Sequence, residues 1–215
     1  MTIPLTLLND TLTATAVAAS PFLPGDIIGF SGTGFLSDAI KMVSRSILTH
    51  VVMVIPSDVL IDGRAQEELY VIQSTIEDGH SGPQLTPLRI VLALYAKGGR
   101  AYHFSLSNDI RAFLKWPILW DLATRKLHGD SYNKLELGQY VLRDLPFITY
   151  LPAIREANSH EEVCSELLAE LLRAGGLPCL DPPLVNPGIL ASYRIYGCMT
   201  QLFGAPASIP SFNTV

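Results

Sequence analysis

The sequence predicts an α+β fold in which a small, mostly antiparallel sheet packs against helices at one side. Short β-branched or alternating segments, typical of strands, occupy the first half of the chain. Apolar residues at helical spacing dominate the second half. The 15 prolines and 16 glycines keep the elements short and the connections numerous. Strands followed by helices, rather than alternating with them, indicate the α+β class.

Each strand of the first half has its own signal. Residues 24–30 (PGDIIGF) predict a turn into a short buried strand, and the β-branched run VVMVI after His50 predicts a strand buried on both faces. Alternating residues in RAYHFSL predict a half-buried strand. The remaining expected elements are a helix at 35–46 and a strand at 68–75 that GHSGP ends before a Pro/Leu-rich bridge. A third is a helix that Asn108 or Asp109 caps and that runs toward Lys126 with a break at Pro117.

The length of 215 residues predicts one domain, 1–215, with an N-terminal extension (1–23), a core (24–176) and an irregular C-terminal wrap (177–215). A hydrophobic share of 48% excludes a disordered chain, because so apolar a chain buries enough surface to offset its ordering entropy. The net charge of −5, without a basic run, argues against a nucleic-acid partner.

The longest uncharged stretch, Ile195 to Val215, contains Gln201, Asn213, two prolines and two glycines. A spanning helix needs roughly 20 mostly apolar residues, so we expect no membrane span, although this apolar tail is compatible with peripheral contact with lipid. No Lys or Arg precedes Lys41, and the N-terminus lacks the compact apolar centre of a signal peptide. We therefore expect a protein that is cytoplasmic as synthesised, with leaderless export left open.

Three widely spaced cysteines, Cys164, Cys179 and Cys198, match neither a zinc ligand set nor an even disulfide framework. They predict synthesis in a reducing compartment and no bound metal, and they leave open whether Cys179 and Cys198 pair.

Cys164 is the first candidate for chemistry. Ser159 and Glu162 predict a capping box, so Cys164 lies in the second turn of a helix that ends at Gly175–Gly176. Backbone N–H groups near a helix start lower the pKa of a thiol, which favours a nucleophile. The alternative is a buried small hydrophobe, because Cys164 shares a helix face with a leucine stripe.

A thiol nucleophile needs a proton acceptor, and His50 is the main candidate. It opens an otherwise apolar strand, where an unpaired ring costs on the order of 1–3 kcal/mol; a satisfied core histidine is the alternative. His160, four residues before Cys164, is a second candidate or a solvated first-turn residue. Gln73, in the next strand, can orient the His50 ring, and the reserves are Glu77 and His103.

The order of the segments PGDIIGFSGTG, SILTHVVMVI, YVIQST, HGDSYN and VCSELLAELL resembles the circularly permuted branch of the NlpC-type, papain-like cysteine hydrolases. In papain itself the Cys helix precedes the His strand, and in this branch the order is reversed. The resemblance covers Pro24 to about Ala174, and its most specific part is the CSEL tetrapeptide at the head of a helix.

The resemblance implies a thiol hydrolase that needs no cofactor and cleaves an amide or ester through a Cys164 acyl-enzyme. His50 is then the base, and Tyr132 of HGDSYN, with the backbone N–H of Cys164, helps to hold the oxyanion. The alternative interpretation, that Tyr132 is a core tyrosine without a role in catalysis, is equally good. The family often has an acid where this chain has Gln73, and a neutral amide orients the ring without stabilising imidazolium.

The substrate classes that the resemblance implies are a cell-wall peptide and an acyl-lipid or N-acyl amide. Three alternatives stay open at this point. One is an acyltransferase of the lecithin retinol acyltransferase-like kind, which shares the His-then-Cys order. The others are a catalytically silent binding module of the same fold and a toxin or phage-encoded wall hydrolase.

Overall fold

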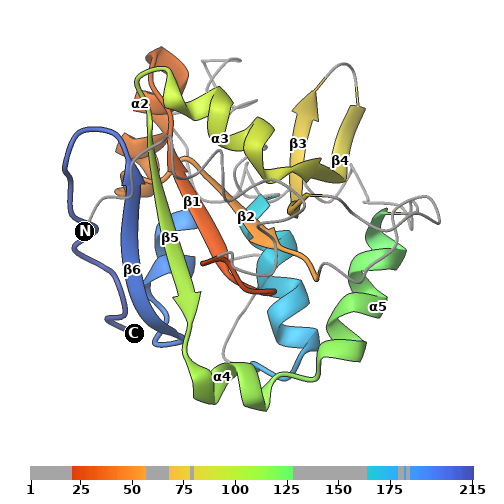
Figure 1. Ribbon diagram of the computed structural model, residues 1–215. Helices are drawn as coiled ribbons and strands as arrows, with labels where there is room; N and C mark the ends of the chain where they lie inside the picture. Colours follow the sequence, from red (N-terminus) through yellow and green to blue (C-terminus); the bar gives the residue numbers. More distant parts are fainter. Residues whose placement is uncertain (1–20, 57–67, 78–79, 128–163, 179–181, 183–184) are drawn as a thin grey trace.

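Six strands form one sheet at the centre of the molecule (Figure 1). In chain order they are β1 (Ile27–Ser31), β2 (His50–Val54), β3 (Tyr70–Glu77), β4 (His80–Pro87), β5 (Arg100–Leu106) and β6 (Tyr196–Phe203). Every neighbouring pair is antiparallel, and the spatial order β4-β3-β2-β1-β5-β6 leaves β4 and β6 as edges. This confirms the α+β class with an antiparallel sheet.

The structure, a computed structural model, describes residues 21–56, 68–77, 80–127, 164–178, 182 and 185–215. Its helices are α2 (Phe35–Ser44), α3 (Leu88–Ala96), α4 (Asn108–Phe113), α5 (Trp116–Leu127) and α8 (Pro187–Ser192), with a further helical segment over residues 164–174.

The sheet divides the apolar core into two clusters, because successive side chains on a strand point to opposite faces. We call the face beneath α3 the α3 face; it carries Ile28, Phe30, Val52, Val54 and Val71. The opposite face carries Ile27, Val51, Met53, Ile72 and Phe104. Side chains of β1 and β2 are buried on both faces, as the β-branched runs predict.

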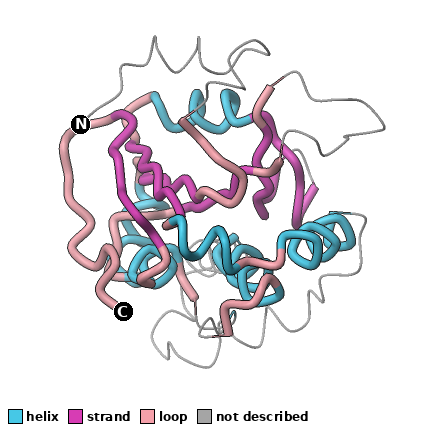
Figure 2. The backbone as a smooth tube through the Cα atoms, turned by 60° about the horizontal axis from the view of Figure 1, so that its bottom comes forward, coloured by secondary structure: helices cyan, strands magenta, loops and turns pink. Residues whose placement is uncertain are grey.

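Helices cover both faces, whereas the sequence predicted them at one side; Figure 2 shows strands between two sets of helices. α3 packs on the α3 face through Leu88, Val91 and Leu92. The opposite face is covered by α5, α8 and the 164–174 segment. The reason for the difference is α3, which falls in the predicted Pro/Leu-rich bridge: Pro87 does not interrupt this helix but stands at its N-cap, where a missing N–H costs nothing.

Two further elements differ from the expectation. β4 begins within GHSGP, which the sequence analysis took as the end of β3. An edge strand tolerates Gly82 and Pro83, because the ladder of hydrogen bonds is needed on one side only. The predicted irregular wrap over 177–215 contains α8 and β6, which pairs with β5.

The helix predicted between residue 108 and Lys126 is broken, although earlier than expected. It divides into α4 and α5 at Leu114–Lys115, and Pro117 lies in the first turn of α5. The prediction that Asn108 or Asp109 caps this helix is wrong, because the N-cap is Ser107, whose hydroxyl accepts from the N–H of Ile110 at 3.3 Å.

The leucine-rich helix ends as predicted. Helical structure runs over 164–174, and Gly176 has φ +116°, a left-handed conformation that glycine adopts without strain. The predicted capping box, Ser159 and Glu162, lies outside the described residues. No helix in the described ranges combines the length and apolar character that crossing a membrane requires.

Candidate functional site

His50, Gln73 and Thr86 form a buried chain of hydrogen bonds across three strands. The His50 Nε2 and Gln73 Oε1 atoms are 2.8 Å apart, and Gln73 Nε2 donates to Thr86 Oγ1 at 2.8 Å. All three residues are at most 9% exposed. The predicted pairing of Gln73 with His50 therefore holds, while Thr86 had no signal in the sequence because β4 was read as a loop.

The sheet register explains this meeting. Met53 pairs with Ile72 and Val54 with Val71, so His50 and Gln73 project from the same face of neighbouring strands. Thr86 pairs with Val71 and projects from that face as well. The three polar side chains thus share the α3 face with an otherwise apolar cluster.

The amide of Gln73 determines which nitrogen of His50 is the base. Since the amide nitrogen donates to Thr86, the amide oxygen accepts from His50, which assigns the ring proton to Nε2. Nδ1 then has the lone pair of the neutral imidazole. Burial lowers the pKa of His50 from its ordinary 6.5, against a smaller raising effect of the Gln73 hydrogen bond. The ring is therefore neutral near pH 7, as a general base must be.

Aromatic rings pack beside His50 on the α3 face. The His50 and Tyr95 rings lie within 8° of parallel, with centroids 6.3 Å apart, and Phe30 stacks on Tyr95 at 4.4 Å. These rings, together with Gln73, fix the orientation of the imidazole. The sequence analysis missed Tyr95, which lies in α3.

Cys164 lies in the core of the opposite face. It is 0% exposed and belongs to the cluster of Val51 and Met53, whereas His50 alternates with these residues and shares the α3 face with Val52. Cys164 is the first described residue of the 164–174 helical segment. The structure therefore joins His50 to Gln73 and groups Cys164 with the leucines on the other side of the sheet.

The remaining predicted residues fall into two groups. His103, a reserve for orienting His50, is engaged elsewhere: its Nε2 lies 2.7 Å from Asp26 Oδ2. Tyr132, His160, Cys179 and the side chain of Glu77 lie outside the described part of the chain. Cys198 is a free, exposed thiol on β6.

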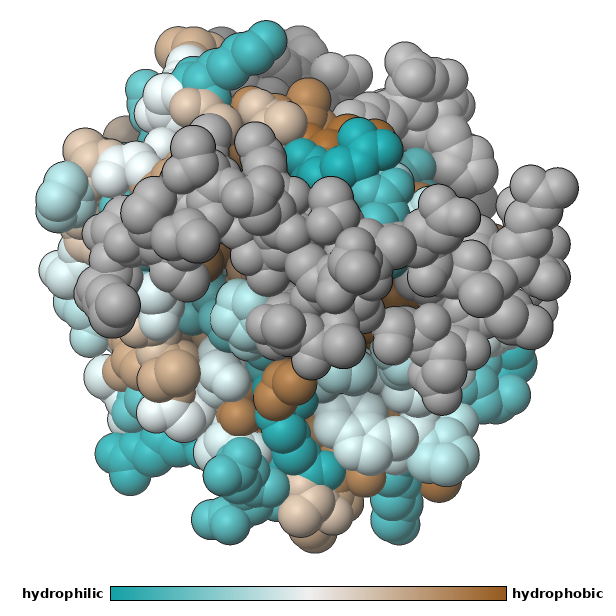
Figure 3. Space-filling view, in the orientation of Figure 1, coloured by the Kyte–Doolittle hydropathy of each residue, from teal (hydrophilic) through white to brown (hydrophobic). Residues whose placement is uncertain are grey.

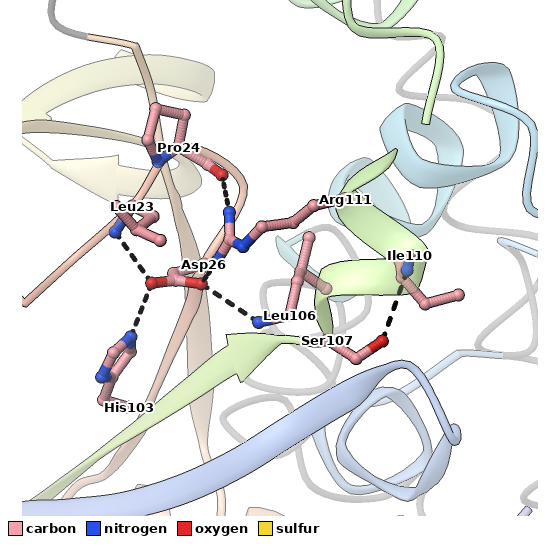
Figure 4. A network of polar contacts seen from close by, with 8 residues as sticks. All are labelled: Leu23, Pro24, Asp26, His103, Leu106, Ser107, Ile110 and Arg111. Atoms are coloured by element: carbon pink, nitrogen blue, oxygen red, sulfur yellow. Dashed lines mark hydrogen bonds and ion pairs between the residues drawn. The ribbon is translucent and has the colours of Figure 1, made fainter. Parts of the chain in front are cut away.

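Asp26, the residue before β1, is the centre of a second polar network (Figure 4). This network lies at the end of the neighbouring strands that is far from His50. Its carboxylate is 0% exposed and accepts from the N–H groups of Leu23 (2.8 Å) and Leu106 (3.1 Å). It also pairs with His103 and with Arg111, which reaches it from α4. The GD dipeptide of the first predicted strand thus ties the start of β1 to the end of β5 and to α4.

The described residues contain no group of three His, Cys, Asp or Glu side chains able to hold a metal ion. On the face shown in Figure 3, hydrophobic residues of the described chain form small groups among polar ones.

The lowered pKa of His50 predicts a pH dependence of stability. Below pH 6.5 the unfolded chain binds a proton at His50 that the folded protein resists, so acidification toward pH 5 lowers the free energy of unfolding. The slope attributable to one such group is at most about 1.4 kcal/mol per pH unit. Urea melts at pH 7, 6 and 5 should show a steeper loss for the wild type than for His50→Gln. Equal slopes would contradict a neutral, desolvated His50.

No protein-family model matches this chain, and no curated protein matches it.

Proposed function

We propose that the chain is a thiol hydrolase of the circularly permuted papain-like type, acting on an amide or ester bond in a cell-wall peptide, an acyl-lipid or an N-acyl amide. The observation that carries the proposal is the His50–Gln73–Thr86 chain. It holds a neutral imidazole in one tautomer at the first position of a strand, as a base that serves a nucleophile requires.

The chemistry follows from the roles of two side chains. This reaction requires the Cys164 thiol to come within hydrogen-bond reach of Nδ1 of His50, from which the sheet separates it in the structure. Nδ1 then accepts the thiol proton, and the thiolate attacks the substrate carbonyl to form an acyl-enzyme. The imidazolium returns the proton to the leaving amine or alcohol, and water then releases the acid. Gln73 holds the ring through both steps but provides no charge to stabilise the imidazolium.

A second candidate is a binding module of the same fold without catalysis. The specific observation that favours it is the position of Cys164, which is fully buried among apolar residues of the opposite face. In that case Cys164 is a small hydrophobic core residue, and His50 is a core histidine satisfied by Gln73.

Alkylation by iodoacetamide separates the two candidates without a known substrate. We would follow each cysteine against pH by peptide mass spectrometry, with exposed Cys198 as an internal reference in the same molecule. A hydrolase is expected to alkylate Cys164 with a midpoint below the roughly 8.5 of a free thiol. His50→Ala should move that midpoint upward, whereas His103→Gln, which alters another buried histidine, should not.

A Cys164 that reacts only after unfolding, with the same profile in His50→Ala, would exclude the hydrolase and leave the binding module. If Cys164 is reactive, product analysis with and without an amine acceptor then distinguishes hydrolysis from acyl transfer.

A further inference from the structure

A cavity of about 560 Å³ opens beyond the last residue of β2. His50 and Val54 are the two ends of that strand, so roughly 13 Å of strand, at about 3.3 Å per residue, separates His50 from this end. The cavity is thus distinct from the His50 site. The described residues that line it are Leu23, Pro24, Pro56, Arg111, Trp116, Pro117 and Trp120.

The aromatic wall of the cavity is held rigidly. Trp116 and Trp120, one turn apart on α5, stack with centroids 5.7 Å apart and 18° between their planes. The Trp116 indole N–H donates to the Arg111 carbonyl at 3.0 Å. A Cβ at Gly25 would lie 2.5 Å from the Trp116 ring, and Gly25 has φ +84°, so only glycine leaves room for this indole. Because this surface is already ordered, the binding of a ligand to it costs little conformational entropy.

Arg111 is the only charged residue among the described lining residues, and its charge is already matched. It pairs with Asp26 and donates to the Pro24 carbonyl. A ligand anion beside Arg111 would also lie near the Asp26 carboxylate, which repels it. Within the described part of the chain, the contacts with Asp26 and Pro24 use one N–H on each terminal nitrogen of the guanidinium, so a second N–H on each of these nitrogens is left for a ligand. The complementary ligand offers a neutral oxygen acceptor and an apolar body.

We propose that this cavity binds an extended, proline-containing peptide. Polyproline II segments have no internal hydrogen bonds, so their carbonyl oxygens are available to a donor such as Arg111. Their proline rings pack on aromatic and proline surfaces at little cost in conformational entropy. Arg111 already holds one proline carbonyl, that of Pro24, which shows that the guanidinium accommodates this acceptor. The proposal is independent of whether the chain is a hydrolase.

Tryptophan fluorescence tests the proposal directly, because both tryptophans of the chain line the cavity. The full chain is titrated with blocked octaproline and, as a control of equal length, a blocked (Gly-Ser)₄ peptide. We expect a saturable emission change with octaproline alone. Trp120→Leu, which keeps an apolar side chain on α5, should weaken binding at least about tenfold, equivalent to about 1.4 kcal/mol. Phe35→Ala, which removes a ring 75% exposed on α2, should leave it unchanged.

Circular dichroism melts establish that each variant is folded, and Trp116 remains as the reporter in Trp120→Leu. The proposal is overturned if the two peptides give the same response, or if octaproline binds folded Trp120→Leu as tightly as the wild type. Saturable binding of sodium decanoate without binding of octaproline would also overturn it, and would assign the cavity to apolar anions.

Discussion

Replacement of Asp26 by alanine is expected to lower the free energy of unfolding by about 3–5 kcal/mol, because it leaves a charged partner buried and uncompensated. Asp26 is 0% exposed, and Arg111, whose side chain is 16% exposed, turns its guanidinium toward it. The substitution also removes the acceptor of two backbone N–H groups, those of Leu23 and Leu106. Chemical denaturation at pH 7 measures the loss.

Asp38→Ala is the matched control, since it also removes an aspartate from an ion pair. The Asp38 side chain is 70% exposed and lies 3.3 Å from Lys41, so its loss is expected to cost only about 0–1 kcal/mol. If Asp26→Ala lowered the free energy of unfolding as little as Asp38→Ala, the buried network in Figure 4 would contribute no net stability.

Gln73→Leu is expected to cost about 2–4 kcal/mol, because it leaves the His50 N–H and the Thr86 hydroxyl buried without their partner. Gln73→Glu should instead raise the pKa of His50, because a carboxylate beside the ring stabilises imidazolium. Titration of the imidazole by NMR measures the pKa, and urea melts measure the stability.

Thr86→Val provides the control for the second half of this chain. It keeps the branched shape, removes one hydroxyl and leaves the His50–Gln73 contact in place, so its expected cost is smaller, about 1 kcal/mol. A Gln73→Leu variant as stable as the wild type, or an unchanged pKa of His50 in Gln73→Glu, would show that Gln73 does not control the ring.

The elements that could be predicted from the sequence are those with a strong local pattern. The β-branched runs of β1 and β2 and the alternation in β5 each determine a strand without help from distant residues. Edge strands lack that advantage. β4 contains glycine and proline, and β6 (YGCMTQLF) has neither a β-branched run nor a regular alternation of buried and exposed residues, so their existence depends on pairing with β3 and β5.

The polar networks divide in the same way, into partners that a local pattern predicts and partners that only the tertiary structure brings together. The sequence indicated His50 and Gln73 as partners because they lie on successive strands, but Thr86 and the partners of Asp26 gave no local signal. His103 and Arg111 follow Asp26 by 77 and 85 residues, and only the pairing of β1 with β5 and the packing of α4 bring them to it. A carboxylate in a GD dipeptide does not reveal which distant donors will surround it.

The sequence by itself determined the α+β class, the central strands, the leucine-rich helix with its glycine stop, and the candidates His50, Gln73 and Cys164. Only the tertiary structure decided on which face of the sheet each side chain lies. Because strand side chains alternate with a period of two, a shift of one residue moves a side chain to the other face. That alternation places His50 with Gln73 on the α3 face, while helix packing places Cys164 in the opposite cluster.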